Sequence, residues 1–309
     1  MQKRAVVFAG QGAQAVGMGK DLAQAYPACA ALFSKANEVL GYDLAKLCFE
    51  GPIEELTKTV HCQPAIFVVS VACYRALEQE LGGLVPVGVA GLSLGEWSAL
   101  HVAGCLTFED ALRVLAARGR LMQDACDRNQ GGMLSVIGLT MDALRRICAE
   151  TGVEIANLNS PEQTVLSGPK TGIAAAEAKA KEAGAKKAIV LNVAGAYHSS
   201  LMASAGAGLQ QALAGIVFQA PRVPVIANVT GQPHGAADQI RETMVKQVTS
   251  SVQWVTTVEW FRANGVKEYI ECGPGKVLGG LVKRIDSEAT AHSIQDLASL
   301  QKAVPVLKG

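Results

Sequence analysis

Ser93 lies at the centre of the sequence Gly-Leu-Ser-Leu-Gly, residues 91–95. Glycines two positions before and after a serine are typical of a nucleophile elbow, a sharp strand-to-helix turn that points the hydroxyl out of the fold. An apolar run at 85–90 precedes this turn, and a helical pattern follows it to about residue 103. The N–H of Leu94 would then lie at a helix N-terminus and could donate to an oxyanion. We predict that Ser93 is the nucleophile of an acyl-transfer enzyme; the alternative is an ordinary turn with a packed serine.

A serine nucleophile needs a base, and His198 stands out among the five histidines. It follows a predicted strand, in a loop that can reach into a cleft. The others lie in apolar helical stretches, in a turn or near the C-terminus: His61, His101, His234 and His292. A lone histidine is more often structural, so position alone leaves its role open. No acid stands in an obvious motif to complete a triad, and a backbone carbonyl could hold the Nδ1 proton instead.

Arg118 is a candidate for binding an anionic group. It lies three residues after Leu115 and four before Met122, on the apolar stripe of a predicted helix. A charge on that stripe needs a buried partner or a ligand. Arginine offers a planar, permanently charged fork that matches a carboxylate. The alternative is a solvated helix residue, since Arg113 and Arg120 are close by.

The elements that must position these residues alternate between strand and helix, which indicates a parallel α/β sheet. Residues 127–196 follow their own order, β-α-β-β-α-β, which is the ferredoxin-like order. Its predicted strands are 133–139, 153–158, 163–167 and 187–193, and its predicted helices are 141–150 and 170–183. We predict a large α/β-hydrolase-like domain with a mainly parallel sheet, residues 1–126 and 197–309. The ferredoxin-like subdomain, residues 127–196, is inserted into it.

Composition limits the classes of function. The 309 residues are half hydrophobic and carry a formal net charge of +1, without a dense basic stripe. Nucleic acid and membranes are therefore not expected as partners. The longest apolar stretch, 64–74, is shorter than the roughly 20 residues that span a bilayer. Eight cysteines without a Cys-x-x-Cys pair predict neither zinc nor disulfides, and we expect reduced thiols in the cytoplasm.

Several segments together resemble one family, the malonyl-CoA:acyl carrier protein transacylases of fatty acid synthesis, with the related polyketide acyltransferase domains. The matching segments come in the family's order and span nearly the whole chain: 8–14, 63–65, 91–96, 118–122, 159–161, 197–202, 252–254 and 273–278. Such a set is far more specific than the elbow alone. The family also has an inserted ferredoxin-like subdomain.

The resemblance implies a role for each catalytic residue. Ser93 would be acylated, and His198 would be its general base. Gln11 and the N–H of Leu94 would form the oxyanion hole. Gln253 would offer its backbone carbonyl to His198 in place of a triad acid.

The resemblance also implies how the substrate is held. Arg118 would bind the free carboxylate of malonyl, and Gln63 and Asn159 would line the substrate site. Leu92 stands where many relatives have histidine, and Tyr197 replaces phenylalanine before the catalytic histidine. A bulky residue there goes with malonyl in this family, so malonyl is the expected acyl group.

The function implied is a transfer of malonyl from malonyl-CoA to the phosphopantetheine thiol of acyl carrier protein, in fatty acid biosynthesis. No metal or redox cofactor is expected, and the protein is expected to be a monomer. One alternative is a serine esterase or thioesterase, against which the internal Arg118 argues. A trans-acting polyketide acyltransferase or a malonate decarboxylase subunit would use the same chemistry. A non-catalytic docking protein on the same fold is disfavoured by the complete set of candidate residues.

Overall fold

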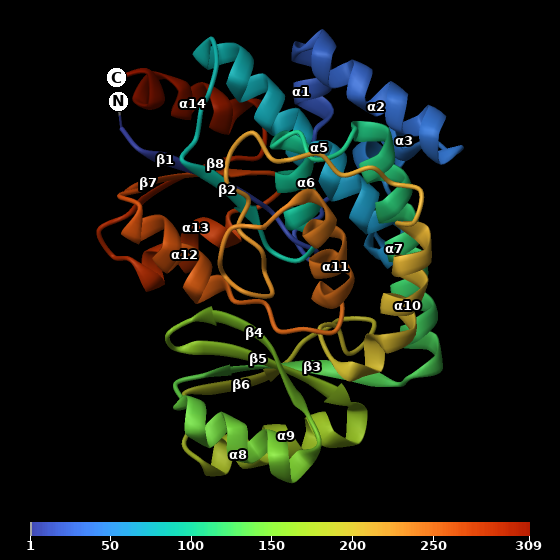
Figure 1. Cartoon of the computed structure of the whole chain (residues 1–309), viewed down its shortest axis with the longest axis vertical. Helices are drawn as coiled ribbons and strands as arrows, with labels where there is room; N and C mark the ends of the chain where they lie inside the picture. The colour runs from blue at the N-terminus through green and yellow to red at the C-terminus, as the bar shows by residue number, and fades with distance from the viewer. Residues whose placement is uncertain (1) are drawn as a thin grey trace.

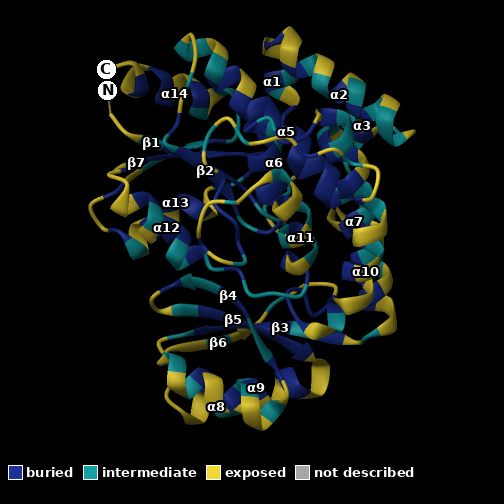
Figure 2. Ribbon diagram, viewed as in Figure 1, coloured by how far each residue is buried: buried dark blue, intermediate teal, exposed yellow. Residues whose placement is uncertain are grey.

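The computed structural model describes residues 2–309 and contains two separate sheets (Figure 1). The first sheet is parallel, in the strand order β2-β1-β7-β8. Its strands are β1 (Arg4–Phe8), β2 (Gly88–Gly91), β7 (Glu268–Cys272) and β8 (Thr290–Ile294). The three strands β1, β2 and β7 are almost wholly buried, as in sheets covered by helices on both faces (Figure 2). The predicted α/β class with a mainly parallel sheet is confirmed.

The side chains of β1 alternate between the two faces of this sheet. Val6 and Phe8 belong to the larger core cluster, and Ala5 and Val7 to a second cluster. The helices of the larger cluster are α1 (Lys20–Ala25), α2 (Pro27–Leu40), α3 (Leu44–Glu50), α4 (Ile53–Thr57), α5 (Thr59–Leu81), α6 (Leu94–Val102), α7 (Phe108–Arg128), α10 (Ala203–Ala212), α11 (Ala237–Gln247) and α14 (Leu297–Lys308). The second cluster is closed by α12 (Trp254–Ala263) and α13 (Val277–Ile285).

Helix α5 runs through the middle of the larger cluster. By length and composition it could cross a membrane, with a mean hydropathy of 1.3. However, 83% of its apolar window is buried inside the protein, so α5 is a core helix. Its apolar side chains pack against other parts of the protein rather than against lipid.

The second sheet is antiparallel, in the order β4-β5-β3-β6. Its strands are β3 (Gly131–Ile137), β4 (Glu154–Ser160), β5 (Gln163–Pro169) and β6 (Lys187–Val190). Helices α8 (Met141–Thr151) and α9 (Lys170–Glu182) cover its outer face (Figure 1). All six elements lie within the predicted insert, 127–196, and they follow the predicted ferredoxin-like order.

The segment after α11 joins the two sheets. The N–H of Val252 donates to the carbonyl of Ala156 at 2.8 Å, and the carbonyl of Val252 accepts the N–H of Leu158 at 2.9 Å. The hydroxyl of Ser251 also donates to the carbonyl of Ile155. Residues 251 and 252 therefore lie along β4 like a short additional strand.

Candidate active site

Ser93 occupies the turn between β2 and α6. Its backbone has φ 54° and ψ −101°, in the region that residues other than glycine rarely adopt. Such strain costs about 1–3 kcal/mol and persists only where the surroundings enforce it. A Cβ on Gly91 would lie 2.0 Å from the carbonyl carbon of Gly95, and one on Gly95 would lie 2.2 Å from the Phe8 carbonyl oxygen. Both glycines are therefore required by close backbone packing, as the elbow pattern predicts.

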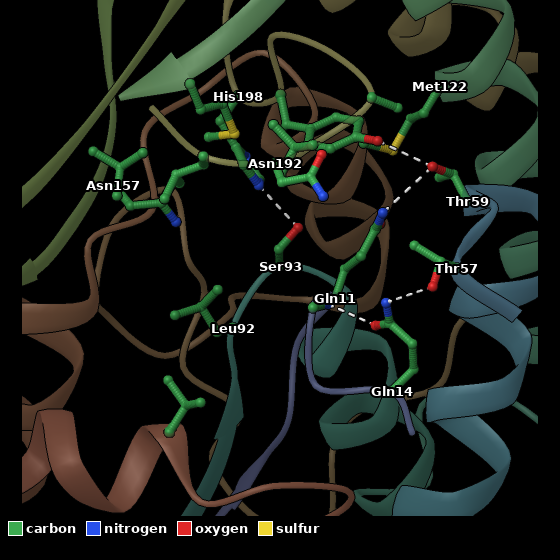
Figure 3. A pocket seen from close by; sticks show the side chains of 18 of the residues that line it. Gln11, Gln14, Thr57, Thr59, Leu92, Ser93, Met122, Asn157, Asn192 and His198 are labelled. Atoms are coloured by element: carbon green, nitrogen blue, oxygen red, sulfur yellow. Dashed lines mark hydrogen bonds between the residues drawn. The ribbon is translucent and has the colours of Figure 1, made fainter. Parts of the chain in front are cut away.

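His198 is the partner of this serine. Its Nε2 lies 2.8 Å from Ser93 Oγ (Figure 3). Its Nδ1 lies 2.9 Å from the carbonyl oxygen of Gln247 and 3.2 Å from that of Ser250. Carbonyl oxygens only accept hydrogen bonds, so Nδ1 carries the proton in the neutral ring. Nε2 is then free to accept the proton of the serine hydroxyl.

The prediction for Gln253 is wrong. Gln253 is the N-cap residue of α12, and its backbone carbonyl accepts both the N–H and the hydroxyl of Thr257 at 3.0 Å. That carbonyl belongs to the first turn of a helix and does not face His198. Gln247, at the end of α11, and Ser250 take the place predicted for it. The sequence gives little indication of this role for Gln247. The residue ends α11, a short amphipathic helix that was not predicted from the sequence.

Burial makes His198 a weak base in the free protein. The ring is 4% exposed, and burial, with the nearby charge of Arg118, lowers its pKa from 6.5 to about 4. The two backbone carbonyls at Nδ1 oppose this shift. Because the folded-state pKa is below neutrality, the ring is neutral, and Nε2 is an acceptor, at every pH above about 5.

This shift predicts the acid limb of the pH profile. If His198 acts as a base, the rate constant of Ser93 acylation should stay level from pH 7 to about 5 and fall below that with a midpoint near 4. Single-turnover acylation followed by rapid quench at each pH measures this. A return to pH 7 before assay separates titration from unfolding. A midpoint near 6.5, the ordinary value for histidine, would contradict the prediction.

Arg118 reaches the same serine from α7. It is 1% exposed, and its Nη2 lies 3.1 Å from Ser93 Oγ. Two amide oxygens hold the guanidinium: Gln63 Oε1 is 2.7 Å from Nη1, and Gln247 Oε1 is 3.1 Å from Nη2. Within residues 2–309 its Nε has no hydrogen-bond partner and no carboxylate pairs with it. Arg118 is thus a buried guanidinium with donor capacity left for an anion.

Arg118 stays charged at neutral pH. Burial lowers its pKa to about 10, and the negative charge of Glu96 offsets part of that shift. Gln63 supports the guanidinium and does not line the cavity. Asn159, by contrast, does line the cavity, and its buried Oδ1 has no partner within the described residues.

Gln11 and Leu94 are the residues predicted to form the oxyanion hole. Leu94 is the first residue of α6, so its N–H is not used by the helix itself. Gln11 follows β1 and lines the cavity together with Ser93 (Figure 3). Its Nε2 donates to Thr59 Oγ1 at 3.3 Å, and that oxygen lies 3.0 Å from the hydroxyl of Tyr197. The side chain of Gln11 is therefore fixed against α5, which holds the backbone of the turn beside Ser93.

The cavity in front of Ser93 has a volume of about 540 Å³. Residues of the insert and of the parallel-sheet domain both line its wall, which combines apolar surface with polar side chains. Met133, Asn157 and Val165 come from the insert, while Leu92 and Leu281 come from the parallel-sheet domain. Its size and lining are typical of a site for a small organic ligand.

A strained serine, a buried histidine oriented by carbonyls and an adjacent buried arginine define the site of a serine acyltransferase. Comparison with known proteins agrees with this class. Residues 5–304 match the family described as acyl transferase domain, and the chain belongs to that family.

Three similar proteins have names that describe their activity. The malonyl CoA-acyl carrier protein transacylase of Escherichia coli (strain K12) is 43% identical over 308 residues, covering 98% of this chain and 99% of that protein. The crystal structure of an acyl carrier protein S-malonyltransferase from Vibrio cholerae gives a TM-score of 0.94 at 42% identity, covering 98% of this chain and 100% of that one. A malonyl-transacylase in complex with its type II polyketide acyl carrier protein gives 0.95 at 42% identity, covering 99% and 100%.

Proposed function

We propose that this protein transfers a malonyl group from malonyl-CoA to the phosphopantetheine thiol of acyl carrier protein. The observation that carries the proposal is Arg118, a buried and charged guanidinium that contacts Ser93 Oγ and lacks a carboxylate partner among the described residues. An acyl group with a terminal carboxylate supplies that partner while its carbonyl lies at the serine. An acetyl group cannot do so.

In the first half-reaction, Ser93 Oγ attacks the thioester carbonyl of malonyl-CoA while His198 Nε2 takes the hydroxyl proton. The negative charge develops on the carbonyl oxygen, where the N–H of Leu94 and the turn at Gln11 stabilise it. The C–S bond then breaks. Coenzyme A leaves with the proton from His198, and a malonyl ester remains on Ser93.

In the second half-reaction, the thiol of the carrier's phosphopantetheine arm enters the same cavity. His198 takes the thiol proton, and the sulfur attacks the malonyl ester. The C–O bond to Ser93 breaks, and the proton returns to the serine oxygen. The reaction as proposed uses no metal or redox cofactor, and its product is the malonyl carrier thioester of fatty acid biosynthesis.

The free cysteines bear on where the protein works. All eight are free, and seven of them are buried. Thiols of this kind persist in a reducing compartment. The free thiols therefore support a cytoplasmic location.

Intact mass spectrometry tests the proposed function. Incubation with malonyl-CoA is expected to add the mass of one malonyl group to the protein. Addition of acyl carrier protein bearing phosphopantetheine should then remove that mass and add it to the carrier. A serine hydrolase would give a different result, in which free malonate accumulates and no stable adduct or malonyl carrier is found.

A further inference from the structure

Two buried polar side chains lie behind the nucleophile turn and have no part in the transfer described above. Asn228 and Glu96 are both completely buried, and neither lines the cavity. Asn228 ends an irregular segment beside β2, and Glu96 lies in the first turn of α6. Burial of an amide and a carboxylate is unfavourable unless their polar atoms are satisfied. Their partners therefore indicate what these two residues do.

The amide of Asn228 spans the nucleophile turn. Its Oδ1 accepts the N–H of Ser93 at 2.6 Å, and its Nδ2 donates to the carbonyl of Gly91 at 2.7 Å. One side chain thus fixes the peptide that enters Ser93 and the end of β2 at the same time. Because the amide has one acceptor and one donor group, it fits both backbone partners only in one orientation.

The carboxylate of Glu96 holds the backbone of Asn228 and the side chain of Gln247. Its Oε2 accepts the backbone N–H of Asn228 at 3.1 Å and Gln247 Nε2 at 2.6 Å. Its Oε1 lies 2.7 Å from Nε2 of His234, which is also buried. Gln247 Nε2 donates further to the carbonyl of Ser93 at 3.0 Å. The side chains of Asn228 and Gln247 therefore hold the N–H and the carbonyl of Ser93, and Glu96 holds the backbone of the first residue and the side chain of the second.

We propose that Asn228 is a positioning residue for the nucleophile, and that Glu96 anchors it. Ser93 has a backbone conformation that persists only when the surroundings enforce it. If the peptide before Ser93 relaxed, Oγ would leave the position 2.8 Å from His198 Nε2. This inference rests on the proposed function in one respect, since it assumes that Ser93 is the nucleophile.

Asn228→Ala tests the inference with two rates. One is the single-turnover rate constant for acylation of Ser93 by malonyl-CoA. The other is the rate of covalent labelling by phenylmethanesulfonyl fluoride, which needs an activated serine but no carboxylate site. Both are expected to fall about 10- to 100-fold, as for a nucleophile misplaced by roughly 1 Å. The KM for malonyl-CoA should change by less than about threefold, because Arg118 and the cavity wall are untouched.

Asn37→Ala is the matched control. The Asn37 amide also accepts a backbone N–H, from Ala45 at 3.1 Å, and donates to a neighbour, Asp43 Oδ1 at 2.9 Å. It lies on α2 and does not line the cavity. Loss of its amide should lower the free energy of unfolding but leave both rates at the parental values.

Two further results decide the inference. Asn228→Asp keeps the acceptor for the Ser93 N–H and loses the donor to Gly91, so both of its rates should also be lower than those of the parent. This variant provides the test if Asn228→Ala does not fold. Parental rates in a folded Asn228→Ala or Asn228→Asp variant would overturn the positioning role. If the parent protein is labelled by the sulfonyl fluoride but not by malonyl-CoA, the proposed function fails while the test of Asn228 by labelling still stands.

Discussion

Ser93→Ala is expected to abolish both the malonyl adduct and malonyl transfer. The substitution removes the oxygen that lies 2.8 Å from His198 Nε2, so position 93 can no longer form the ester. Loss of a nucleophile of this kind lowers kcat on the order of 10⁶-fold in serine enzymes. The variant should be folded, because alanine fits in the space of serine. Intact mass after incubation with malonyl-CoA, together with a transfer assay to the carrier protein, measures the effect.

Ser98→Ala is the control for this substitution. Ser98 lies on α6 and is even more deeply buried than Ser93, and its hydroxyl has no hydrogen-bond partner within residues 2–309. It should keep the adduct and the transfer rate. A malonyl adduct that survives in Ser93→Ala would mean that another residue is acylated, and the proposed mechanism would be wrong.

Arg118→Ala is expected to reverse the preference for the acyl group. Truncation of one partner of a buried, hydrogen-bonded charge pair costs about 2–5 kcal/mol, or roughly 30- to several thousand-fold in kcat/KM for malonyl-CoA. Acetyl-CoA has no terminal carboxylate, so it makes no ion pair with Arg118 that the substitution could remove. Its kcat/KM should therefore change far less. The measurement is the ratio of acylation rate constants for the two thioesters, determined side by side.

Two variants on the same residue and helix sharpen this test. Arg118→Lys keeps a positive charge but loses the planar fork, so it should recover part of the malonyl rate at most. Arg120→Ala removes an exposed arginine two residues away and should leave the ratio unchanged. An unchanged malonyl-to-acetyl ratio in Arg118→Ala would remove the role proposed for that residue.

The turn at Ser93 was predictable because close backbone packing leaves room only for glycine on either side of it. Gly91 and Gly95 are each excluded from carrying a Cβ by backbone atoms, and such a requirement is visible as a residue type. The burial of Arg118 was predictable from its position on α7. It lies on the apolar stripe of that helix, and this stripe packs into the core. The insert was predictable from period alone, because strands and helices alternate there with short turns.

The orientation of His198 was not predictable in the same way. Gln247 and Gln253 are both glutamines near the same turn, and the choice between them depends on where α11 ends and α12 begins. The carbonyl of Gln253 is used by the first turn of α12, while that of Gln247 lies where a helix ends and its carbonyls lack helical partners. Helix ends of this kind are the least certain part of a pattern in sequence.

The contacts of Asn228 and Glu96 could not be predicted from the sequence either. They join residues that are far apart along the chain, such as Asn228 with Ser93 and Glu96 with Gln247. No periodic pattern indicates such contacts, because each partner is a single polar residue in an otherwise apolar setting. The strand β8 and the helix α14 were not predicted either, and α14 contains Pro305, a residue that is unfavourable inside a helix.

The short loop between α11 and α12 serves two structural roles at once. Its carbonyls at Gln247 and Ser250 hold the ring of His198, and two residues later Val252 pairs with β4. His198 itself enters the site on the segment that returns from the insert. A slip of β4 against this loop would therefore turn the imidazole as well as shift the cavity wall. Substitutions on the exposed surfaces of α8 and α9 are therefore expected to leave the catalytic pair in place, whereas a substitution that breaks the pairing of β4 with this loop is expected to disturb it.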